Sequence, residues 1–322
     1  MPKLLKAIAA ASAITLAGLT QAHAAWPERA VQWVVPYPAG GGSDVIARVV
    51  ASTIEKTLGQ TVIVENKPGA GTIIGASFIQ NAKPDGYVFG TADSGTLAFN
   101  PWLYSKLQYD PVKFTYIGGL ARFPLMLAVN EASPFKTLEE FIAAARKDPG
   151  KLTASSAGSG SPHHLALEMF KQRAGVDIAH VPYKGAAPAI QDLLGGQVSA
   201  SFVDSAAGLA NIKAGKLRVL AVATPERLAL LPNVPTMAEA GVNNFNAYAW
   251  QGLVGPAGIP GDVVEKLNAD LQAALKSPEV DGKIKGMGVE PMPMSAADFK
   301  AYADQQREEW GSVIKAAGIK LD

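Results

Sequence analysis

Two segments of this sequence are rich in glycine and in small hydroxyl side chains. They are residues 36–44 (PYPAGGGSD) and 155–163 (SSAGSGSPH), and each lies where a strand pattern gives way to a helix pattern. The first N–H groups of a helix lack backbone partners and carry partial positive charge. Glycine adds exposed N–H groups without bulk, so each segment is a candidate site for an anion such as a carboxylate.

Glycines at such junctions also serve tight turns without any ligand, and one segment alone does not decide between these uses. Here each segment falls in a separate α/β block. Ligands of parallel α/β sheets lie beyond the carboxyl ends of the strands, where these loops are found. The pair therefore favours two half-sites facing each other across a cleft. Neither segment contains lysine or arginine, so an anion would be recognised by amides, hydroxyl groups and helix dipoles.

Acidic and imidazole side chains near these junctions are the next candidates. Asp204 follows the expected strand 198–203 and can accept a hydrogen bond from an amine or hydroxyl group. Asp44 lies in the first turn of its helix, where a carboxylate also stabilises the helix without a ligand. His163 and His164 point about 100° apart on a helix, so they cannot share a metal ion. We expect one of them to line the cleft and the other to pack or face solvent. Further candidates for cleft walls, with core packing as the alternative, are Tyr37, Tyr183, Lys184 and Trp250.

Motifs for other chemistries are missing from the sequence. There is no G-x-x-x-x-G-K-[ST] loop, and Gly69-Ala70-Gly71 is followed by Gly75, one position late for a dinucleotide fingerprint. No G-x-S-x-G elbow occurs, and without cysteine there is no thiolate chemistry. We therefore expect no nucleotide, no metal, no other cofactor and no catalytic residue. The protein is not expected to be an enzyme.

Strand and helix patterns alternate along the chain. Short apolar runs predict strands at 31–35, 62–65, 87–91, 125–129, 153–156, 179–181, 198–203, 218–223 and 251–254. Apolar residues at helical spacing predict helices at 44–58, 72–82, 137–148, 162–173, 186–194, 262–275 and 296–317, with a short helix ending near 215. Alternation of this kind indicates βαβ units and parallel sheets.

The alternation forms two α/β blocks followed by a shorter remainder. The elements after residue 231 are too few for a third domain, so they are expected to return and complete the first lobe. This predicts lobe 1 at residues 25–122 plus 231–322 and lobe 2 at 123–230. The chain would cross between the lobes near residues 122 and 230.

The beginning of the chain has the pattern of a secretion signal. Lys3 and Lys6 precede the apolar run 7–19, and Ala22-His23-Ala24 matches an A-x-A cleavage site. The run is too short to span a bilayer comfortably, so residues 1–24 are expected to be a cleaved signal peptide rather than an anchor. Secretion without an anchor predicts a periplasmic protein. No basic stripe appears among the remaining residues, so no nucleic-acid partner is expected.

Several further motifs occur in order along nearly the whole mature chain. They are 35–44 (VPYPAGGGSD), 64–71 (VENKPGAG), 83–87 (KPDGY), Asn100-Pro101 with Leu103-Tyr104, 156–165 (SAGSGSPHHL), 181–185 (VPYKG) and 231–241. Together they are highly specific. In these motifs the sequence resembles the Bug-type receptors, the periplasmic solute-binding proteins of tripartite tricarboxylate transporters.

That resemblance implies a two-lobe, Venus-flytrap α/β fold, each lobe a mostly parallel sheet flanked by helices. It also implies that the two glycine-rich junctions grip one carboxylate of the ligand through backbone amides and ordered water. The family often has Thr-His where this chain has Thr96-Leu97, and usually Asp-Asn where it has Asp204-Ser205. The expected ligand-binding residues are Tyr37, Ala39, Gly40, Gly41, Asp44, Ser94, Thr96, Ser156, Gly158, Ser159, Gly160, Ser161, His163 and Asp204.

The expected function is capture of a small carboxylate (an organic acid, an amino acid or an aromatic acid) in the interlobe cleft. The expected partners are the permease subunits of a tripartite tricarboxylate-type transporter, with the receptor acting as a monomer. An alternative is an extracytoplasmic sensing module that presents the ligand to a signalling receptor, since it needs the same closing cleft. A hydrolase is a third interpretation.

Overall fold

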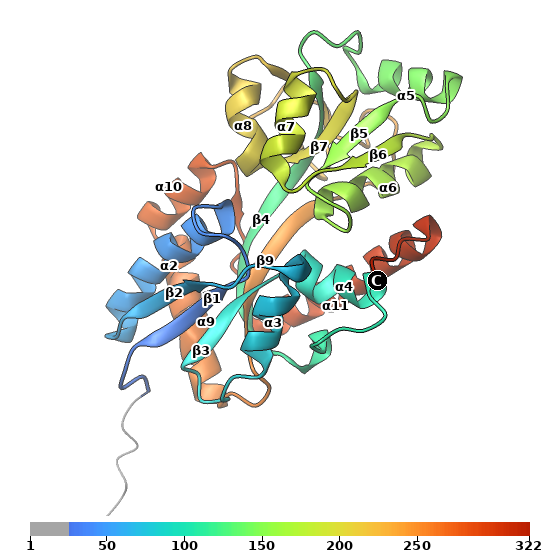
Figure 1. Cartoon of the computed structure of the whole chain (residues 1–322). Helices are drawn as coiled ribbons and strands as arrows, with labels where there is room; N and C mark the ends of the chain where they lie inside the picture. Colours follow the sequence, from blue (N-terminus) through green and yellow to red (C-terminus); the bar gives the residue numbers. More distant parts are fainter. Residues whose placement is uncertain (1–25) are drawn as a thin grey trace, which may run out of the picture.

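One ten-stranded sheet runs through both lobes of the computed structural model, which describes residues 26–322 (Figure 1). The expected signal peptide lies outside the described residues. The strands are β1 (Val31–Val35), β2 (Val62–Asn66), β3 (Val88–Asp93), β4 (Thr115–Asn130), β5 (Thr153–Ser156), β6 (Ala179–Pro182), β7 (Ala200–Asp204), β8 (Leu217–Val222), β9 (Tyr248–Gly255) and β10 (Glu290–Pro291). Their order is β2-β1-β3-β9-β4-β7-β5-β6, with β8 and β10 also paired to β4.

Parallel strands form the two ends of the sheet, and antiparallel strands join them. β2, β1 and β3 are parallel in lobe 1, and β7, β5 and β6 are parallel in lobe 2. Between these sets, β9 and β4 run antiparallel to their neighbours. The expected α/β architecture is thus present, and the parallel strands of the two lobes belong to one mixed sheet.

Helices cover both faces of this sheet. They are α2 (Gly42–Leu58), α3 (Ile73–Gln80), α4 (Asn100–Leu103), α5 (Leu138–Lys147), α6 (Pro162–Ala174), α7 (Ala186–Leu194), α8 (Ser205–Lys213), α9 (Gly261–Lys276), α10 (Pro278–Gly286) and α11 (Ala296–Ala317). Short helical turns also follow β2, β3 and α4. Within residues 26–322, no helix is both long and apolar enough to cross a membrane.

Local capping patterns mark the ends of several helices. Thr137 and Glu140 form a reciprocal capping box at the start of α5. Ser161 caps α6 and Pro162 occupies its first position. Gly59 ends α2 in a left-handed conformation, with φ of 69°. These local devices fix where each helix begins and therefore where its free N–H groups lie.

The strand β4 is the first connection between the lobes. It was expected to cover 125–129 but spans 16 residues. Its first part pairs with β9 as far as Pro124 opposite Tyr248, and its second part pairs with β7 from Leu125 opposite Asp204. The chain thus passes between lobes inside a continuous strand.

The return connection lies later in the chain than residue 230. Residues 231–247 pack on lobe 2: the Phe245 ring stacks on Phe202 at 5.8 Å, and Met237 donates its backbone N–H to Val222. We therefore place the return at the start of β9 rather than near residue 230. The remaining C-terminal elements, α9 to α11, pack against the first lobe as β9 does.

Candidate functional site

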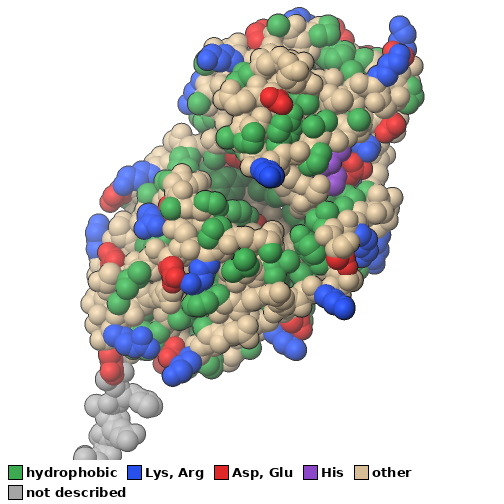
Figure 2. All heavy atoms as spheres, in the orientation of Figure 1, with side chains coloured by type: hydrophobic (Ala, Val, Ile, Leu, Met, Phe, Trp, Pro, Cys, Tyr) green, Lys and Arg blue, Asp and Glu red, His purple; other side chains and the backbone are tan. Residues whose placement is uncertain are grey.

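The two lobes touch where several helices begin. A Cβ placed on Gly42, at the start of α2, would lie 3.9 Å from the Cβ of Ala206, at the start of α8. A Cβ placed on Gly160, just before α6, would lie 2.8 Å from Leu103 in lobe 1. Figure 2 shows the surface hollowed where the two lobes meet. The loops that the sequence singled out therefore lie at this boundary.

In lobe 1, the loop before α2 presents its backbone outward. Ala39, Gly40 and Gly41 are exposed, and Gly40 has a φ of 81° that favours glycine. No side chain caps α2, so its first N–H groups have no side-chain partner. This set of amide donors, at the positive end of a 17-residue helix, suits an anion.

The Asp44 carboxylate braces this loop from inside. It accepts hydrogen bonds from Gly40 N (2.8 Å), from Arg48 Nε (3.1 Å) and from Asn66 Nδ2 (2.9 Å). Burial alone would raise the pKa of Asp44, but the hydrogen bonds and the charge of Arg48 hold the pKa below its usual value. Asp44 is thus an ionised support of the loop, with its oxygens already occupied.

A second network lies at the carboxyl end of β3. Tyr37 donates its hydroxyl hydrogen to Asp93 Oδ2, and Thr96 donates from its backbone N–H and its hydroxyl to Asp93 Oδ1 (2.8 and 2.7 Å). Burial, followed by the charge of Asp93, raises the pKa of Tyr37 well above its usual range. The hydroxyl of Ser94, by contrast, is buried and has no partner within the protein. Of the expected contacts here, Ser94 has a hydroxyl without a partner, whereas Thr96 is engaged in positioning Asp93.

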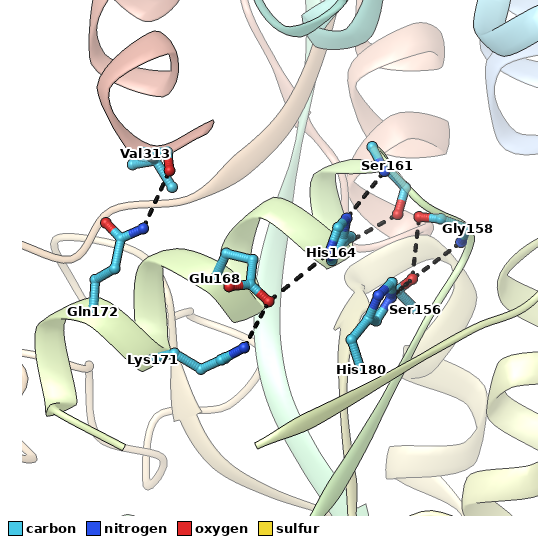
Figure 3. Close-up of polar contacts among 10 residues, drawn as sticks. Ser156, Gly158, Ser161, His164, Glu168, Lys171, Gln172, His180 and Val313 are labelled. Carbon is cyan, nitrogen blue, oxygen red and sulfur yellow. Dashed lines mark hydrogen bonds and ion pairs between the residues drawn. The ribbon is translucent and has the colours of Figure 1, made fainter. Parts of the chain in front are cut away.

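In lobe 2, two imidazole rings hold the glycine-rich loop from behind (Figure 3). Gly160 donates its backbone N–H to His164 Nδ1 (3.1 Å), and Ser156 Oγ lies 2.7 Å from His180 Nε2. The two rings stack with centroids 3.8 Å apart. Gly158 and Gly160 have φ values of 134° and 76°, so this loop requires glycine at both positions.

Both stacked imidazoles are neutral at ordinary pH. Burial, with the charges of His180 and Lys171, lowers the pKa of His164 to about 3. Burial and the charge of Lys171 lower the pKa of His180 to about 4. The expectation that one of the adjacent histidines packs therefore fits His164, and His180 is a loop support that sequence reasoning did not select.

His163 points to a different partner. Its Nε2 lies 3.1 Å from Asp204 Oδ2, and Asp204 Oδ1 accepts from the backbone N–H of Ala207 at the start of α8. Burial would raise the pKa of Asp204, but the hydrogen bond and charge of His163 and the backbone N–H groups hold it below its usual value. The pair links the start of α6 to the start of α8.

Two polar side chains at this boundary were not selected from the sequence. Gln251 on β9 pairs with Asp93 in the sheet, and its Nε2 is buried without a partner within the protein. The hydroxyl of Ser205, the first residue of α8, is also buried without a partner within the protein. Ser94 Oγ and His163 Nδ1 are likewise buried and without a partner within the protein. A buried polar atom without a partner costs about 1–3 kcal/mol, so a water molecule or a polar ligand group at any one of these atoms would be stabilising.

Other expected contacts lie elsewhere. Ser159 is exposed on its loop, and Ser161 is engaged as the cap of α6. Tyr183 donates to Asp192 (2.6 Å) and Lys184 is exposed. The Trp250 ring is buried against Phe299 and Tyr302 in the core. Trp250 therefore packs in the core and does not form a cleft wall.

The described residues do not assemble a hydrolytic or metal site. The buried Ser156 contacts His180, but no carboxylate orients that imidazole. Across residues 26–322, no group of three or more His, Cys, Asp and Glu side chains is placed to hold a metal ion. The arrangement is that of a binding cleft with donors on both sides.

Comparison with known proteins identifies similar receptors. Residues 46–319 match the model of the tripartite tricarboxylate transporter family receptor. Protein BugT of Bordetella pertussis is 34% identical over 301 residues, covering 92% of this chain and 91% of its own length. An R. palustris protein solved with adipate is 35% identical, with a TM-score of 0.84 over 92% of this chain and 100% of that one. MatC from Rhodopseudomonas palustris, solved with bound malate, is 32% identical, with a TM-score of 0.79 over 90% of this chain and 100% of that one.

Proposed function

This chain belongs to the tripartite tricarboxylate transporter receptor family, and from that premise we propose that it captures a small carboxylate between its lobes. The family consists of periplasmic solute-binding receptors rather than enzymes. Relatives of the same fold hold malate and adipate. The ligand proposed for this chain is a small organic acid bound at one site per chain, without metal or nucleotide.

The observation that carries this proposal is the meeting of helix starts from both lobes. The uncapped start of α2 lies against the start of α8, and α8 is tied to the start of α6 by the His163–Asp204 pair. Each dipole–charge contact contributes about 0.3–1 kcal/mol when exposed and up to ~2 kcal/mol when partly buried. Charge-assisted hydrogen bonds add roughly 1.5–3 kcal/mol each. Together these contributions are large enough for micromolar affinity once the entropy and desolvation costs of association are subtracted.

Delivery to membrane permease subunits is the second part of the proposal. It rests on the family, whose receptors serve tripartite transporters. We propose that the protein reaches the periplasm through residues 1–24 and works there as a monomer. The sequence pattern at the N-terminus supports the first point, and a cleft built from one chain supports the second.

Calorimetry on refolded, ligand-stripped protein tests the binding site. Malate, adipate, glutamate and benzoate serve as probes, because they sample organic, amino and aromatic acids. We expect at least one acid to bind with one site per chain, and EDTA to leave the affinity unchanged. Amides of the acids that bind should bind far more weakly, since they keep most of the shape and lose the negative charge. An affinity abolished by EDTA, or equal affinities for acid and amide, would contradict the proposal.

A further inference from the structure

The apolar core of the molecule is continuous between the lobes on one face of the sheet and divided on the other. On the face covered by α3, α11 and α6, one cluster of buried side chains extends from lobe 1 into lobe 2. On the opposite face, α2 and α9 enclose a lobe 1 cluster, and α7 and α8 cover a separate lobe 2 cluster. The alternation of β4 shows the two faces, since Leu125 and Leu127 belong to the shared cluster and Met126 to the separate one. The lobes are therefore joined unequally on the two faces.

The shared face holds the lobes together through α6 and α11. Buried residues of both helices, among them Met169 of α6 and Trp310 of α11, belong to the one cluster. Gln172 of α6 also donates from Nε2 to the carbonyl oxygen of Val313 in α11, at 3.1 Å (Figure 3). Separating the lobes here would expose apolar surface to water, at a free-energy cost that grows with the area exposed.

The contact of α8 with lobe 1, on the other face, is slighter. Glycines make it on the lobe 1 side: a Cβ placed on Gly42 would lie 3.9 Å from that of Ala206, and a Cβ placed on Gly288, after α10, would lie 3.0 Å from that of Ser205. Within residues 26–322, the side-chain hydrogen bonds and ion pairs of α2, α8 and α10 stay inside their own lobes. Separation at this contact would therefore expose less apolar surface and break no polar interaction.

The chain crosses between the lobes in two neighbouring strands. β4 passes from one lobe to the other between Pro124 and Leu125, and β9 begins at Tyr248, opposite Pro124. Two paired strands bend together, so they allow one lobe to rotate against the other as a rigid body. Because the lobes are held on one face of the sheet and barely joined on the other, this rotation is directed to the face that carries α2 and α8.

We propose that the lobes open on one side only, with α6 and α11 remaining in contact as a pivot while α2 and α8 move apart. This inference rests on the proposed function, because a ligand must enter between the lobes. The uncapped start of α2 lies at the contact that opens. Closure brings its amides toward lobe 2 and onto a carboxylate held in the cleft.

Spin labels on pairs of introduced cysteines measure the two contacts separately, since the chain itself has no cysteine. Lys56→Cys with Lys213→Cys spans α2 and α8, and Arg173→Cys with Gln305→Cys spans α6 and α11. All four side chains are exposed and lie outside the glycine-rich loops, so the labels should disturb neither the fold nor the cleft. Pulsed dipolar spectroscopy gives each distance in ligand-stripped protein and in protein saturated with an acid. The probe is the acid among malate, adipate, glutamate and benzoate that binds most tightly.

The two distances should respond differently to the acid. Across α2 and α8 we expect the mean distance to shorten by more than about 2 Å, the size of a domain rearrangement, and across α6 and α11 to change by less than about 1 Å. The second pair is the matched control, because it carries the same labels across the same two lobes.

A disulfide across the contact that opens tests whether the ligand needs this motion. The Cβ spacing of 3.9 Å between Gly42 and Ala206 suits a disulfide, which joins Cβ atoms roughly 3.5–4.5 Å apart. Gly42→Cys with Ala206→Cys, oxidised without ligand, should take up the radiolabelled acid at least about tenfold more slowly than the same protein after reduction, because the opening motion limits entry. Comparing oxidised with reduced samples cancels the effect of the substitutions themselves. The unmodified protein, treated with the same oxidant, should show no change.

The outcomes are distinguishable. Equal shortening of both distances, or shortening across α6 and α11 alone, overturns the one-sided opening and leaves the proposed function standing. Tight binding of an acid with neither distance changed, or equal uptake by oxidised and reduced protein, overturns it in the same way. If none of the acids binds, the proposed function fails and this inference fails with it.

Discussion

Single glycines in the two loops serve different purposes. Gly40, Gly158 and Gly160 have positive φ values, so a side chain there strains the backbone whatever the ligand does. Gly41 is different: its φ is −76° and its ψ 166°, an extended conformation that any residue adopts. A Cβ at Gly41 would meet only the carbonyl oxygen of Pro38, at 3.4 Å. The backbone at Gly41 therefore does not require glycine, and we propose that close approach of a ligand to the loop is the reason for one there.

Replacement of Gly41 therefore tests ligand contact without a folding defect. We expect Gly41→Val to weaken carboxylate binding at least tenfold, about 1.4 kcal/mol, because the branched side chain blocks approach to the loop amides. Its melting temperature should stay within about 2 °C of the unmodified protein, as for a surface substitution. Thermal unfolding and calorimetry on the same sample make the comparison.

Gly261→Val is the matched control, since Gly261 also lies at a helix start with open space around it, in α9. It should bind normally. Gly160→Val should lose both stability and affinity, because its φ is 76° and its added atoms would meet Leu103 and Leu321. Normal affinity in a folded Gly41→Val protein would show that this loop is only a turn.

Residue-level reasoning from sequence succeeded where one residue carries its own local signal. The Thr137–Glu140 capping box and the Ser161-Pro162 helix start are local patterns, and both formed. Gln251 and Ser205 carry no such signal. Gln251 reaches the site only because β9 pairs with β3, far away in the sequence. His180 likewise supports the loop through a stacking contact that spacing along the chain does not encode.

At the level of secondary structure, most helices and strands could be predicted, but the longest strand could not. β4 begins at Thr115, in a stretch that contains Gly118 and Gly119, which weaken a strand pattern. Those glycines are required by neighbours: a Cβ at Gly119 would lie 2.5 Å from the carbonyl oxygen of Met292. The helix α10 was also missed, since its sequence PEVDGKIKG holds two glycines and few apolar residues. The contact of residues 231–247 with lobe 2 depends on aromatic packing between distant segments.

The loop between β5 and α6 should make the protein sensitive to acid. Unfolded histidine has a pKa of about 6.5, whereas the folded values for His164 and His180 are lowered to about 3 and about 4. As pH falls from about 6.5 toward about 4, the unfolded chain binds protons that the folded chain refuses, so the free energy of unfolding decreases. Above about 6.5 both states are neutral at these positions, and the contribution is fully present.

Urea unfolding at several pH values measures this effect. His180→Gln retains a polar group near Ser156 but cannot titrate, so its unfolding free energy should fall less steeply between about pH 6.5 and about pH 4.5. Carboxylates titrate in both proteins, and their contribution cancels in the comparison. If the unfolding free energy depended on pH equally in the two proteins, folding would not be lowering the pKa of His180.

For the whole molecule, the lobes should move relative to each other when the ligand binds. The described structure has the lobes in contact at Gly42 and Gly160, with a hollow between them (Figure 2). Small-angle scattering should show the radius of gyration of ligand-stripped protein falling when the bound acid is added. A radius that does not change with ligand would remove the case for closure.

The C-terminal elements have a consequence for the order of folding. In lobe 1, β3 pairs with β9, the core residue Phe99 packs its ring on Trp310 of α11, and Leu321 donates its backbone N–H to the carbonyl oxygen of Leu103. The first lobe therefore remains unfinished until almost the last residue of the chain has been synthesised, although its first strand lies at the very beginning. Domains usually fold as units, N-terminal ones first, but here the earliest-made lobe must wait for the latest-made segment. Native packing of the first lobe is therefore completed only after the segment that forms the second lobe has been made.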